Sequence, residues 1–446
     1  MPAAAPIGTT WADRLSAPFR RFLAIEAAST LLLLGATGVA LAWVNSPWGS
    51  SYHQLWHTEV RIGVGRAVLA LSLQHWVNDG LMVLFFFLVG MEIKHELVHG
   101  ELSSRERAML PVFAALGGML APAALYTAVE GSGPAASGWG VPMATDIAFA
   151  VAALAVLGAR VPPGLKVFLL ALAIVDDLGS IAVIALFYTA KLSLAALGAA
   201  GLGLAVVYAA SRAGIRSYAI YGALGGAIWL AMLASGIHAT VAGVLLGFLT
   251  PATAFAPGGG FVRRGRELAA DLLERLETDE PAEPKRMIAD LASRRREAIS
   301  PLEQLTRWLH PWVAFAVMPL FALANAGVVL DLGTLRDPLA LRVTVAVVVG
   351  LVIGKPLGIA SFAWASVRLG MARLPTGVTW LAILGAGALG GIGFTMAIFI
   401  TTLAFQDPSF IAASKVGVLA ASVLATATGL LLVARALPRS AGGEGG

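Results

Sequence analysis

The stretch KVFLLALAIVDDLGSIAVIALFY (residues 166–188) decides the fold of this chain. As a helix that rises about 1.5 Å per residue, it is long enough to cross a hydrocarbon core of ~30 Å. Two acidic residues, Asp176 and Asp177, nevertheless stand near its middle. Ionisable groups at membrane depth are costly and usually functional. The stretch therefore predicts a membrane-spanning helix that carries a site for ions or protons.

The composition of the whole chain extends this interpretation. Of 446 residues, 58% are hydrophobic and only 13% are charged, whereas soluble domains average about 25% charged residues. Apolar stretches rich in Leu, Ala, Val and Gly recur without the alternation of an outer-membrane barrel. The chain has no Cys, which excludes disulfides and thiolate chemistry. No P-loop motif is present, so ATP is not expected to drive the protein and no cofactor is predicted.

The expected fold is an all-α polytopic membrane protein with twelve transmembrane helices and a small extramembrane β-hairpin. A cytoplasmic N-terminus (1–21) precedes helices 1–8 (22–250), a charged cytoplasmic loop (251–307), helices 9–12 (308–437) and a cytoplasmic tail (438–446). The predicted spans are 22–44, 75–97, 108–129, 139–158, 166–188, 191–210, 218–235, 237–250, 308–330, 339–365, 377–402 and 410–434.

The basic residues test this topology. With the N-terminus inside, 24 of the 31 Lys and Arg residues fall on the cytoplasmic side, 6 fall outside, and Lys355 lies within a span. Cytoplasmic loops carry such an excess of positive charge, so the pattern predicts an inner-membrane protein with both termini cytoplasmic. The net charge of +5 thus reports topology, and no nucleic acid is expected as a partner. On the outer side, residues 46–72 contain a partly alternating, Gly-containing pattern that predicts a short hairpin.

Asp176 and Asp177 are predicted to bind the transported ion. Neighbouring carboxylates disfavour each other's ionisation, so the pair is expected to hold protons near physiological pH. Oxygen ligands also suit a hard cation. Competition of protons and cations for one pair is the physical basis of cation/proton exchange. The alternative is a buried acid pair that a Lys or Arg neutralises for structural reasons.

Two segments predict interrupted helices. Gly and Pro surround Thr145 and Asp146 in GVPMATDIAF (140–149), and GAGALGGIGFT (385–395) ends on Thr395. Each belongs to a three-helix group, 108–188 or 339–434, and the two groups face opposite ways. Paired interruptions of this kind are typical of inverted-repeat transporters whose broken helices meet at midplane. Asp146 is expected to stabilise the positive helix ends, although Pro142 alone would kink the span and Gly-rich helices also serve close packing.

Further charged residues extend the candidate site. Lys355, in IGKPLG (353–358), is predicted to pair with Asp176 and to release its proton when a cation takes that carboxylate. The alternative is a counter-charge that never titrates. Asp79 is either a pathway residue or a helix cap. Glu92, Lys94, His95 and Glu96 form an acid–His cluster that predicts pH sensing, or an ordinary solvated helix end.

Motifs along nearly the whole chain resemble the NhaA family of sodium/proton antiporters. They include LVGMEIKHEL (88–97), TDIAFA (145–150), ALAIVDDLGSIAVIA (171–185), GIHATVAG (236–243), GKPLG (354–358) and GIGFTMAIFI (391–400). The resemblance implies a secondary antiporter that regulates intracellular pH and sodium. It would bring two protons in for each Na⁺ or Li⁺ exported, with Asp176 and Asp177 as ligands of the transported ion.

The resemblance also implies supporting roles. Asp146, with Thr145, Lys355 and Thr395, would lie where the interrupted helices cross. Residues 46–72 would join two copies into a homodimer within the lipid membrane, and Glu92 to Glu96 would belong to a pH-sensing region.

The sequence departs from the family pattern at two positions in this region. His95 stands where well-known members have Arg, and Thr306 stands where an acid is expected four residues before His310. Both changes are expected to affect the pH at which transport becomes active, and both leave the residues of the transport site unchanged.

Other classes of membrane protein fit less well. A cation channel would need no proton gradient. A sodium-coupled symporter would share the broken helices, but the spans hold few polar side chains for an organic substrate. An intramembrane enzyme is disfavoured because no nucleophile–base pair is evident.

Overall fold

A computed structural model describes residues 11–64, 67–189, 192–215, 217–253, 300–329 and 337–437. The predictions for the C-terminal tail and for most of the charged loop at 251–307 lie outside these ranges. The chain divides into two compact units. The first comprises residues 1–81, 101–188 and 314–446, and the second comprises residues 82–100 and 189–313.

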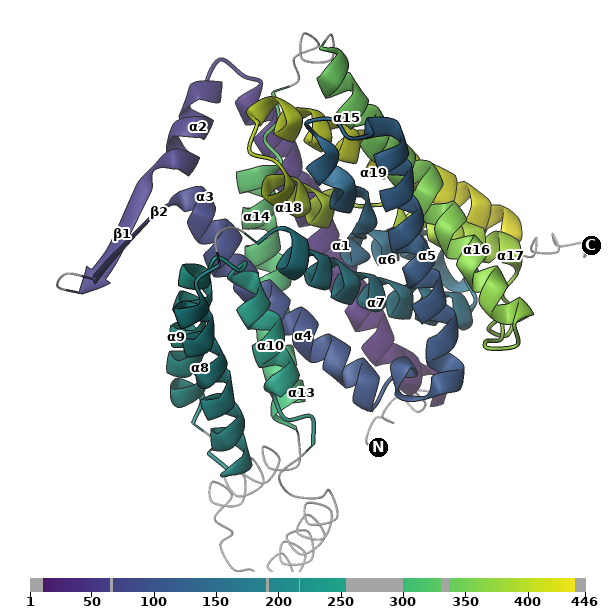
Figure 1. The fold of residues 1–446 in the computed structure, drawn as a ribbon. Helices are drawn as coiled ribbons and strands as arrows, with labels where there is room; N and C mark the ends of the chain where they lie inside the picture. The colour runs from purple at the N-terminus through teal and green to yellow at the C-terminus, as the bar shows by residue number, and fades with distance from the viewer. Residues whose placement is uncertain are drawn as a thin grey trace, which may run out of the picture. The chain divides into compact units, whose positions relative to one another are not determined.

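The first unit holds most of the long helices and both strands (Figure 1). Its elements are α1 (Trp11–Val44), α2 (Gly49–His57), β1 (Glu59–Val64), β2 (Ala67–Ser72), α3 (Leu73–His75), the π-helix η1 (Trp76–Leu81), η2 (Glu101–Ser103), α5 (Arg105–Glu130), the 3₁₀-helix η3 (Ala136–Met143), α6 (Ile147–Val156), η4 (Gly158–Arg160) and α7 (Pro163–Phe187). After residue 313 follow α14 (Met318–Asn325), α15 (Pro338–Val349), the π-helix η7 (Gly350–Gly354), α16 (Lys355–Arg368), α17 (Trp380–Gly390), α18 (Phe394–Ala404) and α19 (Pro408–Ala436).

Local sequence fixes where two of these helices begin. The side chain of Asp337 accepts a hydrogen bond from Leu339 N at 3.1 Å, and α15 starts with the proline that follows. Asp407 caps α19 in the same way, 2.8 Å from Ser409 N. An acidic cap followed by Pro satisfies one free N–H and removes another. The hydroxyl and backbone N–H of Ser409 lower the pKa of the exposed Asp407 because they bond its charged form.

The helices are of the length and composition that a membrane requires. In the described part of the chain, seven are long and apolar enough to cross a bilayer, or up to ten if each of three bent pairs is one span. Each of the twelve predicted spans overlaps a helix or a helix pair. The protein is thus mostly helical, while the count of twelve crossings and the inverted repeat stay predictions.

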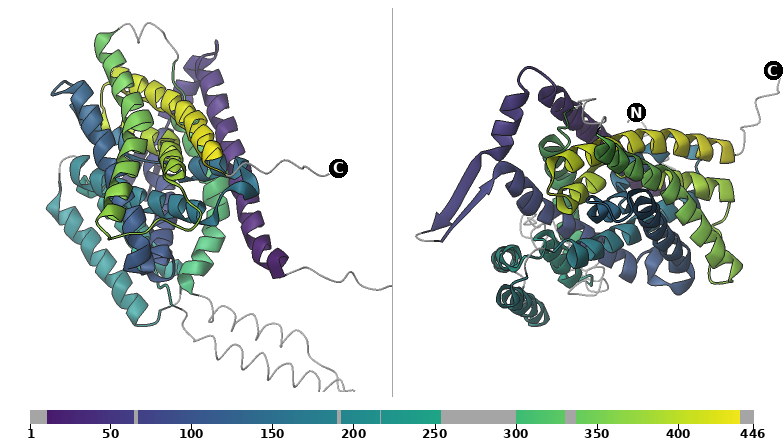
Figure 2. Two further views of the ribbon diagram at one scale, coloured as in Figure 1. Left: turned by 90° about the vertical axis from the view of Figure 1, so that its right-hand side faces the viewer. Right: turned by 45° about the horizontal axis from the view of Figure 1, so that its top comes forward.

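Glycines let the first unit's helices approach closely. In α5 and α16, a Cβ added to Gly117 would collide with Gly358 O, and a Cβ on Gly358 would collide with Gly117 O. Small residues permit such backbone contact between membrane helices. Helix α16 contacts both α5 and α17, and it runs beside α5 in the views of Figures 1 and 2. The helix that begins with Lys355 is therefore held tightly against α5.

The hairpin predicted within 46–72 is present. β1 and β2 pair antiparallel, with Glu59 opposite Ser72 and Val64 opposite Ala67. They extend away from the helices of their unit, between α2 and α3 (Figure 1). Ile62 and Val68 on these strands are exposed, so the ribbon presents apolar side chains.

The second unit is wholly helical in its described residues. It contains α4 (Met82–Val98), α8 (Leu194–Arg212), α9 (Tyr218–Ser235), α10 (Thr240–Leu249) and α13 (Pro301–Trp312). Helices α4 and α10 meet through glycines: a Cβ on Gly90 would lie 2.6 Å from Val244 O, and one on Gly247 would lie 2.7 Å from Phe87 O. Helices α8, α9 and α10 share a small apolar core around Ile228 and Met232.

The α5–α16 contact yields a stability test. Gly117→Ala places a methyl group against Gly358 O, so we expect a loss of about 1–3 kcal/mol from overpacking. Thermal unfolding of the detergent-solubilised protein measures it.

Gly198→Ala in α8 is the matched control, because nothing lies within 4 Å of its added Cβ. It should be neutral or stabilising by up to about 1 kcal/mol, since Ala favours helix over Gly. Equal melting temperatures for the two variants would contradict the close packing of α5 and α16.

Candidate cation site

The first interruption separates η3 from α6. The two helices are bent by 41°, and residues 144–146 between them belong to neither a helix nor a strand. Pro142 lacks a backbone N–H and so weakens the helical ladder. Asp146, with extended φ and ψ of −86° and 99°, is the N-cap of α6. The break predicted at 140–149 is thus present.

The second interruption separates α17 from α18, which are bent by 49°. Residues 391–393, Gly-Ile-Gly, join them. A side chain on Gly391 would collide with Leu351 O. Glycine is therefore needed where this connector passes the backbone of η7.

The two connectors bond to each other. Asp146 N donates to Ile392 O at 2.6 Å, and Thr145 Oγ1 donates to Gly390 O at 2.7 Å. Broken helices leave backbone groups that must find partners, because no water is available in hydrocarbon. Segments 245 residues apart in the sequence satisfy these groups mutually.

The Asp146 carboxylate bridges two helix N-termini. Oδ1 accepts from Phe149 N at 3.3 Å, in the first turn of α6. Oδ2 accepts from Thr395 N at 3.2 Å and from Thr395 Oγ1, in the first turn of α18. Both helix ends carry partial positive charge, which a carboxylate stabilises. Asp146 is only 2% exposed, so the two helix ends supply its counter-charge.

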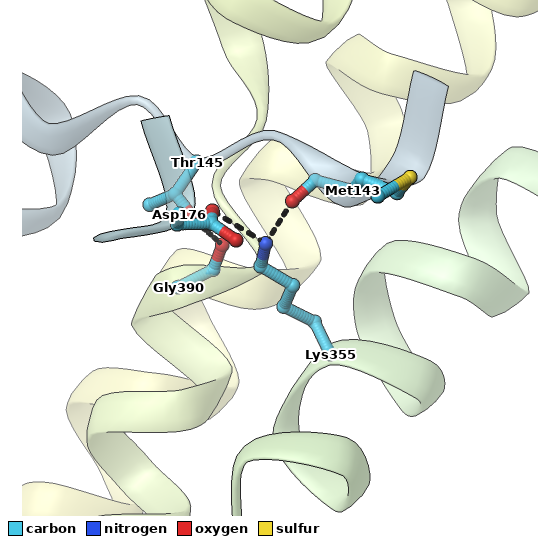
Figure 3. Close-up of polar contacts among 5 residues, drawn as sticks. All are labelled: Met143, Thr145, Asp176, Lys355 and Gly390. Carbon is cyan, nitrogen blue, oxygen red and sulfur yellow. Dashed lines mark hydrogen bonds and ion pairs between the residues drawn. The ribbon is translucent and has the colours of Figure 1, made fainter. Parts of the chain in front are cut away.

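Lys355 crosses from α16 to the same region. Its ammonium lies 2.6 Å from Asp176 Oδ2 and also donates to Met143 O at the end of η3 (Figure 3). Both side chains of the ion pair are 1% exposed. The π-helix η7 directly precedes Lys355, and π-helical turns are frequent at functional sites. A basic group on a helix-end carbonyl complements the partial negative charge there.

Asp177 completes the group of buried charges. It is 3% exposed and interacts electrostatically with Lys355. With all three groups ionised, the two carboxylates and one ammonium leave the site with one net negative charge. Such a site attracts a cation or a proton, because an uncompensated buried negative charge is unfavourable. The structure thus brings together Thr145, Asp146, Asp176, Asp177, Lys355 and Thr395.

Asp79 lies in η1 and is partly buried. Its neighbour Asn78 exchanges two hydrogen bonds with Asn325 at the end of α14, at 3.1 and 2.7 Å. Gln74 Nε2 also donates to Asn325 Oδ1 at 3.3 Å. This amide cluster is not predicted from the sequence, where its only signal is an Asn within the apolar run that ends at Asn325. The role of Asp79 itself stays a prediction.

The predicted pH-sensing residues lie on α4 in the second unit. Lys94 Nζ donates to Phe248 O at 2.7 Å and to Thr250 O at 2.6 Å. It therefore caps the C-terminus of α10, where cations are stabilised. His95 Nδ1 lies 3.9 Å from Glu96 Oε1, and both side chains are accessible to solvent. Glu92 precedes Glu96 by one turn of the same helix.

Comparison with known proteins identifies the family of this chain. A family model described as Na⁺/H⁺ antiporter 1 matches residues 20–433. A protein of Sorangium cellulosum named Na(+)/H(+) antiporter NhaA 2 is 51% identical over 95% of this chain and 89% of its own length. A Rhodopirellula baltica protein named Na(+)/H(+) antiporter NhaA is 47% identical over 96% of both chains. A Myxococcus xanthus NhaA 2 is 48% identical over 93% of this chain and 88% of its own. The chain therefore belongs to the NhaA family of sodium/proton antiporters, a family of multi-pass secondary transporters.

Proposed function

We propose that Asp176 and Asp177 bind Na⁺ or Li⁺ in competition with protons and that the protein exports the cation in exchange for two protons. The observation that carries this proposal is the buried ion pair of Lys355 with Asp176, 2.6 Å apart, beside the meeting point of two interrupted helices. A cation that binds the Asp176 carboxylate removes the partner of the ammonium. An unpaired buried ammonium is unfavourable, so Lys355 then gives up its proton.

The proposed stoichiometry of two protons per cation follows from the protonation states proposed for the site. In the proton-loaded site Asp177 is neutral and Lys355 is charged and paired with Asp176, so the net charge is zero. In the cation-loaded site both carboxylates are ionised, Lys355 is neutral and one Na⁺ is bound, so the net charge is −1. Two protons are exchanged for one cation, and one net charge moves per cycle. Membrane voltage then contributes about 2.3 kcal/mol per 100 mV.

In an alternating-access cycle, the site opens to one side of the membrane at a time, so protons move inward while Na⁺ moves outward. In the proposed topology the chain spans the bacterial inner membrane with both termini cytoplasmic, as its basic residues indicate. Protons reach the pair from outside, the site reorients, and cytoplasmic Na⁺ displaces them inside. Asp146, Thr145 and Thr395 form the framework of this site and do not exchange protons, because their polar groups bond the helix ends.

Residues outside the cation site are proposed to regulate the protein and to join two copies of it. Glu92, Lys94, His95 and Glu96 sense cytoplasmic pH. This is supported by the exposure of His95 and its 3.9 Å approach to Glu96, and by the hydrogen bonds of Lys94 that join this helix to the end of α10. The chain forms a homodimer through residues 46–72. Support comes from the two-stranded ribbon there, whose edges and exposed apolar residues suit pairing with a second copy.

Exchange through the acid pair is tested in inverted vesicles acidified by respiration. Adding Na⁺ or Li⁺ should collapse the pH gradient with the wild-type chain, whereas K⁺ should not. Asp177→Asn should abolish the response, because it removes one ionisable carboxylate while keeping the size of the side chain.

Asp337→Asn provides a matched control, since Asp337 is an exposed helix cap and Asn also serves as a cap. Undiminished exchange in Asp177→Asn, or no response of the wild type between about pH 6 and 9, would refute the proposed site.

The role of Lys355 is tested by stoichiometry. Lys355→Gln removes the second proton carrier, so we expect one proton per cation and loss of the dependence on voltage. The reversal potential of exchange in proteoliposomes with imposed ion gradients measures this ratio. A ratio of two protons in the variant would show that Lys355 is a fixed counter-charge.

The framework role of Asp146 is tested by stability. Asp146→Ala removes the acceptor for two helix ends, and each lost cap costs about 0.5–2 kcal/mol, so a clear drop in melting temperature is expected. Asp146→Asn keeps an acceptor and should lose less. If both variants melt like the wild type but fail to transport, Asp146 acts on the ion directly and not through the framework.

A further inference from the structure

Two carboxylates alone coordinate a hard cation poorly. Such ions take several oxygen ligands, drawn from carboxylates, hydroxyls and carbonyls. Over the described ranges, no three His, Asp or Glu side chains gather in a way that would hold a metal ion. The remaining ligands of a cation at Asp176 and Asp177 must therefore be neutral oxygens close to the pair.

Ser180 lies on the same face of α7 as the acid pair. It follows Asp176 by four residues and Asp177 by three. Helical residues at these spacings are neighbours, with Cβ atoms about 5–6 Å apart. Ser180 is 1% exposed and is thus as deeply buried as the ion pair.

The hydroxyl of Ser180 is unusual among buried serines. In the part of the chain that the structure describes, it is the only serine whose buried Oγ has no hydrogen-bond partner. Other buried helical serines have partners: Ser422 donates to Val418 O and Ser366 to Ala363 O in the preceding turn, both at 2.8 Å. Oδ1 of Asp176 is likewise buried without a hydrogen-bond partner. Two polar oxygens one turn apart thus share this property, although leaving such groups unpaired is costly.

We infer that Ser180 Oγ is a third oxygen ligand of the transported cation, an inference that rests on the proposed function of the acid pair. A hydroxyl supplies a lone pair without a charge and does not ionise near neutral pH. It strengthens binding of the cation without creating another site for a proton. Ser180 therefore biases the competition at the pair toward Na⁺ or Li⁺.

The test is the apparent KM for Na⁺ in inverted vesicles that carry Ser180→Ala, measured at about pH 7 and at about pH 8.5. We expect the apparent KM to rise about tenfold at both values, the loss expected for one hydrogen-bond-like contact to a charge. Vmax should be nearly unchanged. Ser180→Thr keeps the hydroxyl and should restore most of the affinity.

Ser366→Ala is the matched control, because this buried serine lies in α16 and already bonds a backbone carbonyl. It should leave the apparent KM unchanged. An unchanged KM in Ser180→Ala, or a lower Vmax at constant KM, would overturn the inference and assign Ser180 a structural role.

A KM increase confined to pH 7 would also overturn it, because Ser180 would then act through proton binding. The proposed function is judged separately: loss of exchange in Asp177→Asn supports the acid pair whatever the Ser180 variants do.

Discussion

A membrane-spanning helix that breaks leaves N–H and C=O groups where water cannot bond them, and each must find a partner inside the protein. In this chain the two connectors, 144–146 and 391–393, solve the problem together. Asp146 N bonds Ile392 O, Thr145 bonds Gly390 O, and the Asp146 carboxylate takes donors from the first turns of α6 and α18. Because neither break is satisfied without the other, the crossing is a single structural unit.

The need to bond the broken helix ends also gives the buried charges of Asp146 and Lys355 different roles. Asp146 is fully engaged by helix N-termini, so its negative charge belongs to the framework. Lys355 is shared between a backbone carbonyl of η3 and the carboxylate of Asp176. One of its partners is therefore structural and the other is a group that a cation also binds. An ammonium held in this way couples the broken helix to the occupancy of the acid pair.

Much of this arrangement was predictable from the sequence because its signals are local. Two acids inside an apolar run mark α7, Gly and Pro around Thr145 mark the first break, and the alternating pattern in 46–72 marks the hairpin. Each signal depends only on residues close together in the chain. Two distant contacts are also predicted, the Lys355–Asp176 pair and the meeting of the two breaks, because buried charges and paired breaks are so few in the spans. Ordinary helix contacts carry no such signal.

The features that sequence reasoning missed depend on such contacts. Lys94 is predicted from the sequence to take part in pH sensing, and that stays a prediction. The sequence does not reveal that its ammonium also caps α10, where the carbonyls of residues 248 and 250 accept its hydrogen bonds. The Asn78–Asn325 pair and the contact of Gly117 with Gly358 join residues more than 200 positions apart. Ser180 was passed over because a serine in a helix ordinarily bonds its own backbone, and only the folded chain reveals that this one does not.

The π-helical turn η7 makes the site depend on the length of the chain as well as on its chemistry. An α-helix advances by about 100° per residue, and a π-turn accommodates an extra residue within the helix. The number of residues in that turn, five or four, therefore sets the direction around the helix in which the Lys355 side chain points. Residues 350–354 contribute no charged group. Their number nevertheless directs the side chain of Lys355 toward Asp176, and no other lysine among the described residues pairs with that carboxylate. A one-residue deletion there would redirect this ammonium while leaving every polar group of the site in the sequence.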